Sequence, residues 1–260
     1  MTLSLAQIMG WVGAYFWVLI RVAAMLMVAP LFGARGVPRR WRALAAMVFS
    51  LVIAPTLPAV PAIDPLSVEG ILLVGQQILI GVSMGFLLGM VISSFVMAGE
   101  TIAMGMGLGF AQTVDPQNGV SVPLISQFLT IVATLLFISL DGPAMMVKML
   151  ADSFVWLPIG PMGLSADDFW RIVGFGQAMF VNALLIGLPV VTSLLMVNMA
   201  MGVITRAAPQ LNIFSIGFPA TLLIGFFLLL VTSPTWLPNL EHFLHQTLVF
   251  ISDLLRHPRG

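Results

Sequence analysis

Six long apolar stretches dominate this chain of 260 residues. They cover approximately residues 7–31, 43–61, 71–98, 123–140, 173–201 and 211–233. A helix needs about 20 predominantly apolar residues to cross a bilayer, so each stretch is a candidate spanning helix. The stretches are continuous rather than alternating, which argues against a transmembrane barrel. We therefore expect an all-α membrane protein with about six long apolar helices.

The composition excludes most soluble proteins. Charged residues make up 8% of the chain, against about 25% in an ordinary soluble domain. The ten Lys and Arg residues balance ten Asp and Glu residues, so the chain lacks the excess of basic charge that nucleic-acid binding needs. There is no cysteine, which excludes disulfides, thiol catalysis and cysteine-bound metals.

Basic residues indicate the orientation of the chain in the membrane. The connection between the first two stretches carries Arg35, Arg39, Arg40 and Arg42, and the positive-inside rule places it in the cytoplasm. Strict alternation then puts loop 99–122 inside, and loop 141–172 and the tail outside. The tail contains Arg256 and Arg259, which conflicts with that side. We infer that some stretches do not cross the bilayer in the ordinary way.

Loop 99–122 has an unusual pattern. Gly105, Gly107 and Gly109 alternate with Met104, Met106, Leu108 and Phe110. Glycine disfavours a helix, whereas a water-exposed loop would not normally alternate flexible and apolar residues. Non-helical backbone at membrane depth is tolerated where it lines a protein cavity, and methionine adapts to irregular contacts. The pattern predicts a segment at a cavity or at the mouth of a pore.

Arg21 is the only ionisable residue deep inside an apolar stretch. It could face a substrate or ion pathway. It could instead be paired for structural reasons, or it could snorkel from a helix that does not truly span. Ion-coupled transporters and intramembrane enzymes usually bury several ionisable groups. The residues alone therefore favour a membrane-embedded component of a larger assembly, with a loop that gates a passage.

Small and polar residues within the apolar stretches predict contacts between helices. Gly81, Gly85 and Gly89 recur every four residues, and this spacing lets two helices approach closely. The polar residues Gln76, Gln77, Asn182 and Asn198 also lie in apolar runs. We expect them to form hydrogen bonds between helices.

Three separated motifs resemble one known family. They are the run from Arg206 to Pro219 (RAAPQLNIFSIGFP), Gly99-Glu100 followed by the Gly/Met loop and Asp115-Pro116, and the Asp141-Gly142-Pro143 turn. Together they resemble the FliR family of type III secretion export-gate proteins. The resemblance covers nearly the whole chain, and the motifs occur in the family's order.

The resemblance implies a subunit of the flagellar export gate, built from bent helical hairpins within a larger helical assembly. Such a subunit forms a pore with FliP and FliQ for unfolded flagellar subunits, with FlhB and FlhA as further partners. It sits among membrane lipids of the bacterial inner membrane, at the flagellar basal body. It is not an enzyme, has no catalytic residue, cofactor or metal, and binds no nucleic acid. The alternative is a secondary transporter of a small solute, bound near Arg21.

The resemblance also implies a division of the chain. Residues 1–172 would be a P-like membrane part that includes loop 99–122, residues 173–240 a Q-like helical hairpin, and residues 241–260 a polar tail. Loop 104–118 would plug the pore through Met104, Met106, Leu108, Phe110 and Asp115. The residues expected in subunit packing form three groups. They are the glycines Gly81, Gly85 and Gly89, then Glu100 at the base of the plug, and finally Arg206, Gln210 and Asn212 at the Q-like hairpin turn.

Overall fold

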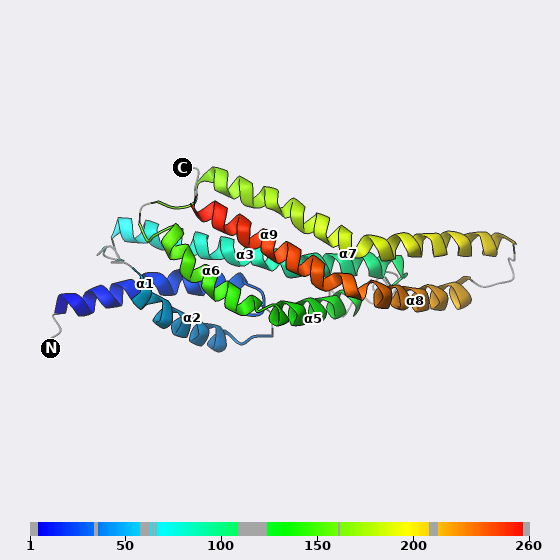
Figure 1. The fold of residues 1–260 in the computed structure, drawn as a ribbon, viewed down its shortest axis with the longest axis horizontal. Helices are drawn as coiled ribbons and strands as arrows, with labels where there is room; N and C mark the ends of the chain where they lie inside the picture. The colour runs from blue at the N-terminus through cyan, green and yellow to red at the C-terminus, as the bar shows by residue number, and fades with distance from the viewer. Residues whose placement is uncertain are drawn as a thin grey trace. The chain divides into compact units, whose positions relative to one another are not determined.

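The computed structural model describes residues 5–33, 36–57, 63, 65, 67–108, 124–160, 162–207 and 213–256. All regular structure in these residues is helical (Figure 1), which confirms the expected all-α class. The α-helices are α1 (Leu5–Val28), α2 (Arg39–Ile53), α3 (Val68–Gly105), α5 (Leu124–Ser139), α6 (Gly142–Trp156), α7 (Ala166–Ala207), α8 (Ile213–Thr232) and α9 (Trp236–Arg256). Short 3-10 helices follow α2 at Ala54–Thr56 and α8 at Ser233–Thr235.

In the part of the chain that the structure describes, fewer helices can span a membrane than the six apolar stretches predict. Within the described residues, α3, α7 and the continuous helical run Gly217–Arg256 are long and apolar enough to cross. A fourth span exists if the bent pair α5 and α6 counts as one. The expectation for stretch 43–61 is wrong, because α2 has 15 residues and about 20 are needed. Pro55 stands in the 3-10 turn where α2 stops, and proline cannot continue the hydrogen bonding of a helix.

A further helix, α6, occupies residues 142–156 of the region expected to be loop 141–172. It meets α5 at a bend of 65°. Asp141 stands at the bend with a φ of 55°, a left-handed conformation that aspartate tolerates better than most residues. A proline follows in the first turn of α6, where its missing N–H costs nothing. The Asp-Gly-Pro turn thus bends the chain between α5 and α6.

The helices form two compact units that are interleaved along the chain. The first unit contains residues 1–90, 141–176 and 244–260, and the second contains residues 91–140 and 177–243. The division into a P-like part, a Q-like hairpin and a tail concerns likeness to other subunits. It therefore stays a prediction.

Apolar side chains fill both units. The core of the first unit includes Trp17, Val22 and Met25 of α1, Ile80 and Met84 of α3, and Phe154 of α6. The core of the second unit includes Phe95 and Ile102 of α3, Leu129 and Phe137 of α5, and Ile186 and Leu194 of α7. In the second unit, glycine allows α3 and α5 to approach closely. A Cβ added to Gly99 of α3 would lie 2.5 Å from the Ser126 Cα of α5.

The start of α7 is stabilised by a capping box. Ser165 donates its N–H to the Asp168 carboxylate at 3.0 Å, and the Asp168 N–H donates to the Ser165 Oγ at 3.3 Å. Asp168 is completely buried, although it lies in the region expected to be a loop outside the membrane. The capping box and the nearby Arg171, 3.3 Å from the Asp168 Oδ1, compensate the buried charge.

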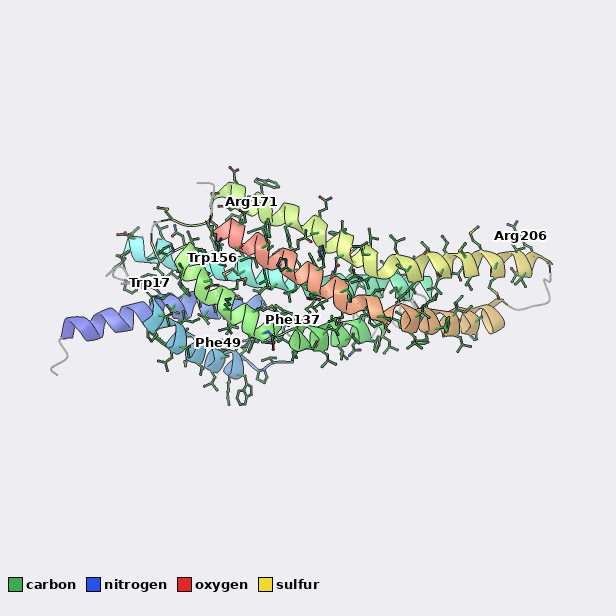
Figure 2. The ribbon with its side chains drawn as sticks, in the orientation of Figure 1. Trp17, Phe49, Phe137, Trp156, Arg171 and Arg206 are labelled. Carbon is green, nitrogen blue, oxygen red and sulfur yellow. The ribbon has the colours of Figure 1, made fainter. Side chains whose placement is uncertain are left out.

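Residues 241–256 form the larger part of α9, where the sequence suggested a polar tail. In the first unit, Arg171 of α7 (labelled in Figure 2) forms an ion pair with Asp253 of α9. The rings of Phe175 and Phe250 stack with their centroids 4.3 Å apart. The Arg256 guanidinium lies 5.0 Å from the centre of the Trp156 ring. These contacts dock the end of α9 onto α7 and α6.

Candidate functional site

The alternating Gly/Met segment begins with an ordered helix end in the second unit. The Leu108 N–H donates to the Ala103 carbonyl oxygen, and the Gly107 N–H donates to the Met104 carbonyl oxygen, both at 3.0 Å. This pair of bonds is a Schellman motif, which requires a left-handed residue between its two ends. Gly107 occupies that position with a φ of 80°. Glycine at 107 adopts this conformation without strain, so it favours the end of α3 here.

The helix expected over the apolar stretch 71–98 is longer than predicted, because α3 continues through Gly105. Helix α7 supports this extension. The Asn198 Nδ2 donates to the Gly105 carbonyl oxygen at 3.2 Å, and a Cβ added at Gly105 would lie 3.4 Å from the Leu194 Cδ1. Contacts with α7 thus outweigh the weak helix propensity of glycine. Two of the expected loop residues, Glu100 and Met104, belong to the helix instead.

The side chain of Met106 is completely buried against α8. A Cβ added at Gly225 would lie 2.7 Å from the Met106 Cγ and Cε and 2.9 Å from its sulfur. The methionine therefore fills the space that any side chain at Gly225 would need. The Thr221 Oγ1 also lies 3.5 Å from the Met106 carbonyl oxygen, at the limit of a hydrogen bond. One turn earlier, Phe218 packs 3.5 Å from the Cβ position of Gly107.

The structure thus anchors the first residues of the expected plug loop 104–118. Met106 is buried, Leu108 is half-buried, and Met104 is 71% exposed. These three residues differ in their surroundings, although they alternate regularly in the sequence. Phe110 and Asp115 lie outside the described residues.

Polar side chains in apolar helices form the predicted hydrogen bonds between helices. In the second unit, the Asn182 Nδ2 of α7 donates to the Ser94 Oγ of α3 at 2.8 Å. Asn198 reaches Gly105, as described above. In the first unit, Gln77 of α3 accepts from Arg21 of α1 at 2.7 Å. For these three residues the prediction from the sequence is confirmed.

Arg21 is completely buried in the first unit, and all three of its nitrogens donate hydrogen bonds. Its Nε donates to the Gln77 Oε1, and one terminal nitrogen donates to the Ser153 carbonyl oxygen at 3.0 Å and the Ser153 Oγ at 3.2 Å. The other terminal nitrogen donates to the Leu157 carbonyl oxygen at 3.0 Å. A single side chain of α1 therefore connects α3 with the end of α6.

None of these four acceptors is a carboxylate. Ser153 and Leu157 lie in the last turn of α6 and just beyond it, where the carbonyl groups carry partial negative charge. The guanidinium also lies 4.1 Å from the centre of the Phe154 ring, at a cation–π distance. These contacts support the structural interpretation of Arg21. They do not fit snorkelling, which keeps the charged group in water.

The glycine stripe of α3 lies against α1 of the same chain. A Cβ added at Gly81 would collide with the Arg21 carbonyl oxygen and lie 2.9 Å from the Ala24 Cβ. At Gly85 it would lie 2.6 Å from the Met25 carbonyl oxygen, whereas at Gly89 the nearest atom is 3.7 Å away. The close helix packing predicted by the spacing thus occurs within the first unit, and it is tightest at the first two glycines.

Arg206 is exposed in the last turn of α7 (Figure 2). A cation at this end of a helix interacts favourably with the helix dipole. Gln210 and Asn212, which were grouped with Arg206 at the expected hairpin turn, lie outside the described residues.

Sequence reasoning missed the roles of several residues in these clusters, Gly225 and Ser153 among them. Gly225 had a detectable signal, because it is an isolated glycine among large apolar residues, and such a glycine within a helix usually has a packing reason. Ser153-Phe154 resembles the family's pattern behind the Asp141-Gly142-Pro143 turn, but nothing in the sequence indicated that Ser153 binds Arg21. Arg21 binds its hydroxyl group together with two main-chain carbonyl groups, and main-chain acceptors are present at every residue.

Comparisons with known proteins agree with the motifs. Residues 12–247 match the family described as bacterial export proteins, family 1. The flagellar biosynthetic protein FliR of Escherichia coli is 38% identical over 249 residues, which cover 96% of this chain and 95% of that protein. FliR of Pectobacterium carotovorum is 36% identical, with 98% and 97% covered, and FliR of Bacillus subtilis is 31% identical, with 84% and 85% covered. The chain therefore belongs to the family of bacterial export proteins, family 1, together with the flagellar biosynthetic proteins FliR.

Proposed function

We propose that this chain is a non-enzymatic subunit of the flagellar type III protein export gate. In this proposal it forms a pore with FliP and FliQ homologues in the bacterial inner membrane, at the flagellar basal body. Unfolded flagellar subunits pass through the pore, and FlhB and FlhA associate with it. Membership of the FliR family carries the proposal. The three helical runs long enough to cross a membrane agree with it.

We further propose that loop 104–118 acts as the plug of this pore. The anchorage of its first residues supports this role. Met106 is buried on α8, Gly105 accepts from Asn198 of α7, and Gly107 ends α3 in a defined geometry. A segment that blocks a passage needs such a fixed starting point, because a loosely held base would let the whole segment drift.

Other assignments from the family resemblance are part of the same proposal. Residues 1–172 would correspond to the P-like part and residues 173–240 to the Q-like hairpin. Glu100 would stand at the base of the plug, and Arg206, Gln210 and Asn212 would contact neighbouring subunits. The exposed position of Arg206 at the end of α7 is compatible with such a contact.

The alternative of a small-solute transporter finds no support at Arg21. A binding site near this residue needs a guanidinium that a solute can reach. Arg21 is 0% exposed, and its nitrogens already donate to four acceptors on two other segments. The side chain has a structural explanation that leaves little capacity for a ligand.

The subunit assignment is tested by expressing the chain with its FliP and FliQ homologues and purifying it in detergent. We expect all three to elute as one complex. Recovery of this chain as a well-behaved monomer under those conditions would count strongly against an export-gate subunit.

The plug assignment needs a separate test on the assembled gate. Deleting residues 109–114 removes the loop just beyond its anchored base. We expect this deletion to raise ion leak across membranes that contain the gate. Gly202→Ala is a suitable control, because a Cβ at this position of α7 meets nothing within 4 Å. A normal leak in a deletion variant that still assembles would exclude the plug while leaving the gate intact.

A further inference from the structure

Helix α2 exposes an almost entirely apolar face in the first unit. Arg40, Leu44, Met47, Leu51 and Pro55 follow each other at intervals of three or four residues, so they line up along one side of the helix. The three middle side chains are each at least half exposed. A neighbouring row of exposed residues widens this face, and it consists of Trp41, Val48 and Val52. The opposite side of α2 is buried.

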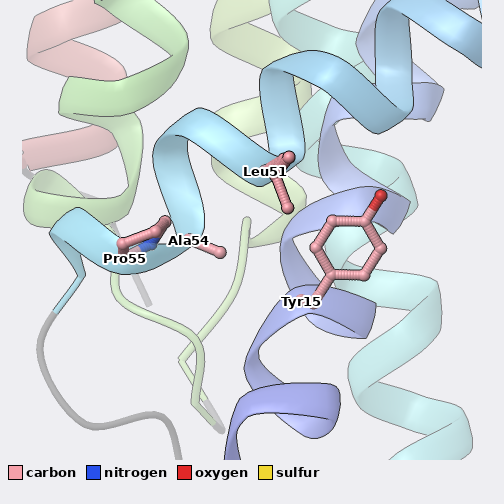
Figure 3. Close-up of a pocket in the computed structure, with 4 residues that line it drawn as sticks. All are labelled: Tyr15, Leu51, Ala54 and Pro55. Carbon is pink, nitrogen blue, oxygen red and sulfur yellow. The ribbon is translucent and has the colours of Figure 1, made fainter.

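An apolar hollow of about 480 Å³ lies at the far end of this face. It is lined by Tyr15 of α1, Leu51 of α2, and Ala54 and Pro55 of the following 3-10 turn (Figure 3). The Tyr15 hydroxyl donates to the Met47 carbonyl oxygen at 3.2 Å. Leu51 belongs both to the exposed face and to the hollow, so the two are continuous. The volume is in the range of small-molecule sites, about 300–1,000 Å³.

The opposite end of the face is positively charged. Helix α2 begins with Arg39 and Arg40, has no acidic residue in its first turn, and lacks a side-chain cap. Both arginines are exposed, and neither pairs with a carboxylate in the described part of the chain. The N-terminus of a helix carries partial positive charge, so cations placed there are unfavourable unless an anion is present. Arginine also suits the planar recognition of phosphate.

The distance between the charged end and the hollow matches a phospholipid. Leu51 lies eleven positions after Arg40, which is about 16 Å along a helix. One leaflet of the hydrocarbon core is about 15 Å thick, half of the full core. A phosphate headgroup at the arginines would therefore place an acyl chain along the apolar face, with its end at the hollow.

From this arrangement we infer that α2 holds an anionic phospholipid of the surrounding bilayer. The headgroup phosphate binds Arg39 and Arg40, and an acyl chain lies over Leu44 and Met47 and enters the hollow beside Tyr15. A protein partner fits less well. A protein interface carries about one hydrogen bond per 100–200 Å², and the rows beyond the arginines offer the Trp41 indole N–H as their only side-chain donor. The site is inferred from α2 and the hollow alone, whereas its test in the assembled complex rests on the proposed function. The co-elution experiment above distinguishes a failure to assemble from a failure to bind lipid.

The lipid site is tested on the full chain within its assembled complex in detergent. Native mass spectrometry measures binding of phosphatidylglycerol and of phosphatidylcholine with the same acyl chains. We expect the anionic lipid to bind at least tenfold more tightly. The variant Arg39→Gln/Arg40→Gln should weaken binding of the anionic lipid about tenfold, since each basic residue contributes separately to attraction for anionic lipid. The control Lys148→Gln, which removes an exposed cation of α6, should keep the wild-type preference.

A separate substitution tests whether the hollow contributes to lipid binding. Ala54→Phe fills it without changing the charge, and it should weaken the binding of both lipids several-fold. Equal affinity of the wild-type protein for the two lipids would overturn the proposal. So would an equal loss in the Lys148→Gln control, or unchanged lipid binding by the Ala54→Phe variant.

A fluorescence measurement checks whether lipid reaches the face at all, even if a variant fails to assemble. Brominated phosphatidylglycerol should quench the part of the tryptophan emission that Trp41→Phe removes. If that part is not quenched in the wild-type complex, another protein subunit covers α2 and the lipid site does not exist.

Discussion

Met106 and Gly225 form a knob and a hole in the second unit, because the methionine side chain occupies the space where a Cβ at Gly225 would lie. The Met106 Cγ and Cε are each 2.7 Å from that position, and the methionine is completely buried. Two residues more than one hundred positions apart thus attach the end of α3 to α8. This contact places the first residues of the Gly/Met segment where the proposed plug begins.

Gly225→Ala should dislodge Met106, since its atoms are closer than a Cβ tolerates. Overpacking of this kind typically costs about 1–3 kcal/mol. The expected results are a lower midpoint of thermal unfolding in detergent and greater ion leak through the assembled gate. Gly202→Ala is the matched control, because it adds the same methyl group where nothing lies within 4 Å. Equal effects of the two substitutions would show that the contact does not matter.

The same contact predicts coupling between the two positions. Met106→Ala alone leaves a cavity, and such truncations cost about 2–5 kcal/mol. In the double variant Met106→Ala/Gly225→Ala the new methyl group enters that cavity, so the loss should be smaller than the sum of the single losses. Coupling energies between touching residues are about 0.5–3 kcal/mol. Thermal unfolding of the wild type, the two single variants and the double variant measures this coupling energy. Strictly additive losses would contradict the contact between positions 106 and 225.

Gly107 should be replaceable only by a residue that accepts a positive φ. Gly107→Ala forces alanine into the left-handed region and should cost about 1–2 kcal/mol. Gly107→Asn should cost less, because asparagine adopts this conformation more readily. Thermal unfolding of the purified complex compares the two. An alanine variant as stable as the asparagine variant would mean that the helix does not end in this geometry.

Arg21→Met should destabilise the first unit strongly. The substitution keeps an unbranched side chain but leaves Gln77, Ser153 and Leu157 without their donor. Each buried acceptor that loses its partner costs about 1–3 kcal/mol. The expected result is little folded protein after detergent extraction, measured by size-exclusion chromatography of a fluorescent fusion. Arg21→Lys should recover only part of the folded yield, because an ammonium group cannot reproduce the planar, forked hydrogen bonding of a guanidinium.

The control for Arg21 is Lys148→Met, which replaces an exposed cation of α6 by the same side chain. It should leave the folded yield near the wild-type level. If Arg21→Met were recovered equally well, the buried hydrogen-bond cluster would not contribute to stability.

Gly85→Val should separate α1 from α3. A Cβ at this position would lie 2.6 Å from the Met25 carbonyl oxygen and 3.0 Å from the Ala29 nitrogen. Since both atoms belong to the backbone, no rotation of a side chain can relieve the overlap. Gly75→Val, in the same helix, is the matched control because nothing lies within 4 Å there. Cysteine crosslinking between α1 and α3 measures the separation, and it should fall only in the Gly85 variant.

Composition and local spacing determined a large part of this protein. The apolar content required helices in a membrane, since a chain in lipid must satisfy its backbone hydrogen bonds within itself. The spacing of Gly81 and Gly85 predicted close helix packing. The presence of Gln77, Asn182 and Asn198 in apolar runs predicted hydrogen bonds between helices. Each of these inferences depends only on residues within a few helical turns.

Tertiary structure alone decided which segments meet. Arg21 binds residues 56 and 132 positions away along the chain, and no local pattern identifies them. Gly105 is helical because Asn198 and Leu194 support it, against its own propensity. Helix propensities differ by about 1 kcal/mol or less for residues other than proline, so a single distant contact can reverse a local prediction. The sequence therefore indicates the helices and the helix faces that pack. Only the tertiary structure determines which helices pack against each other.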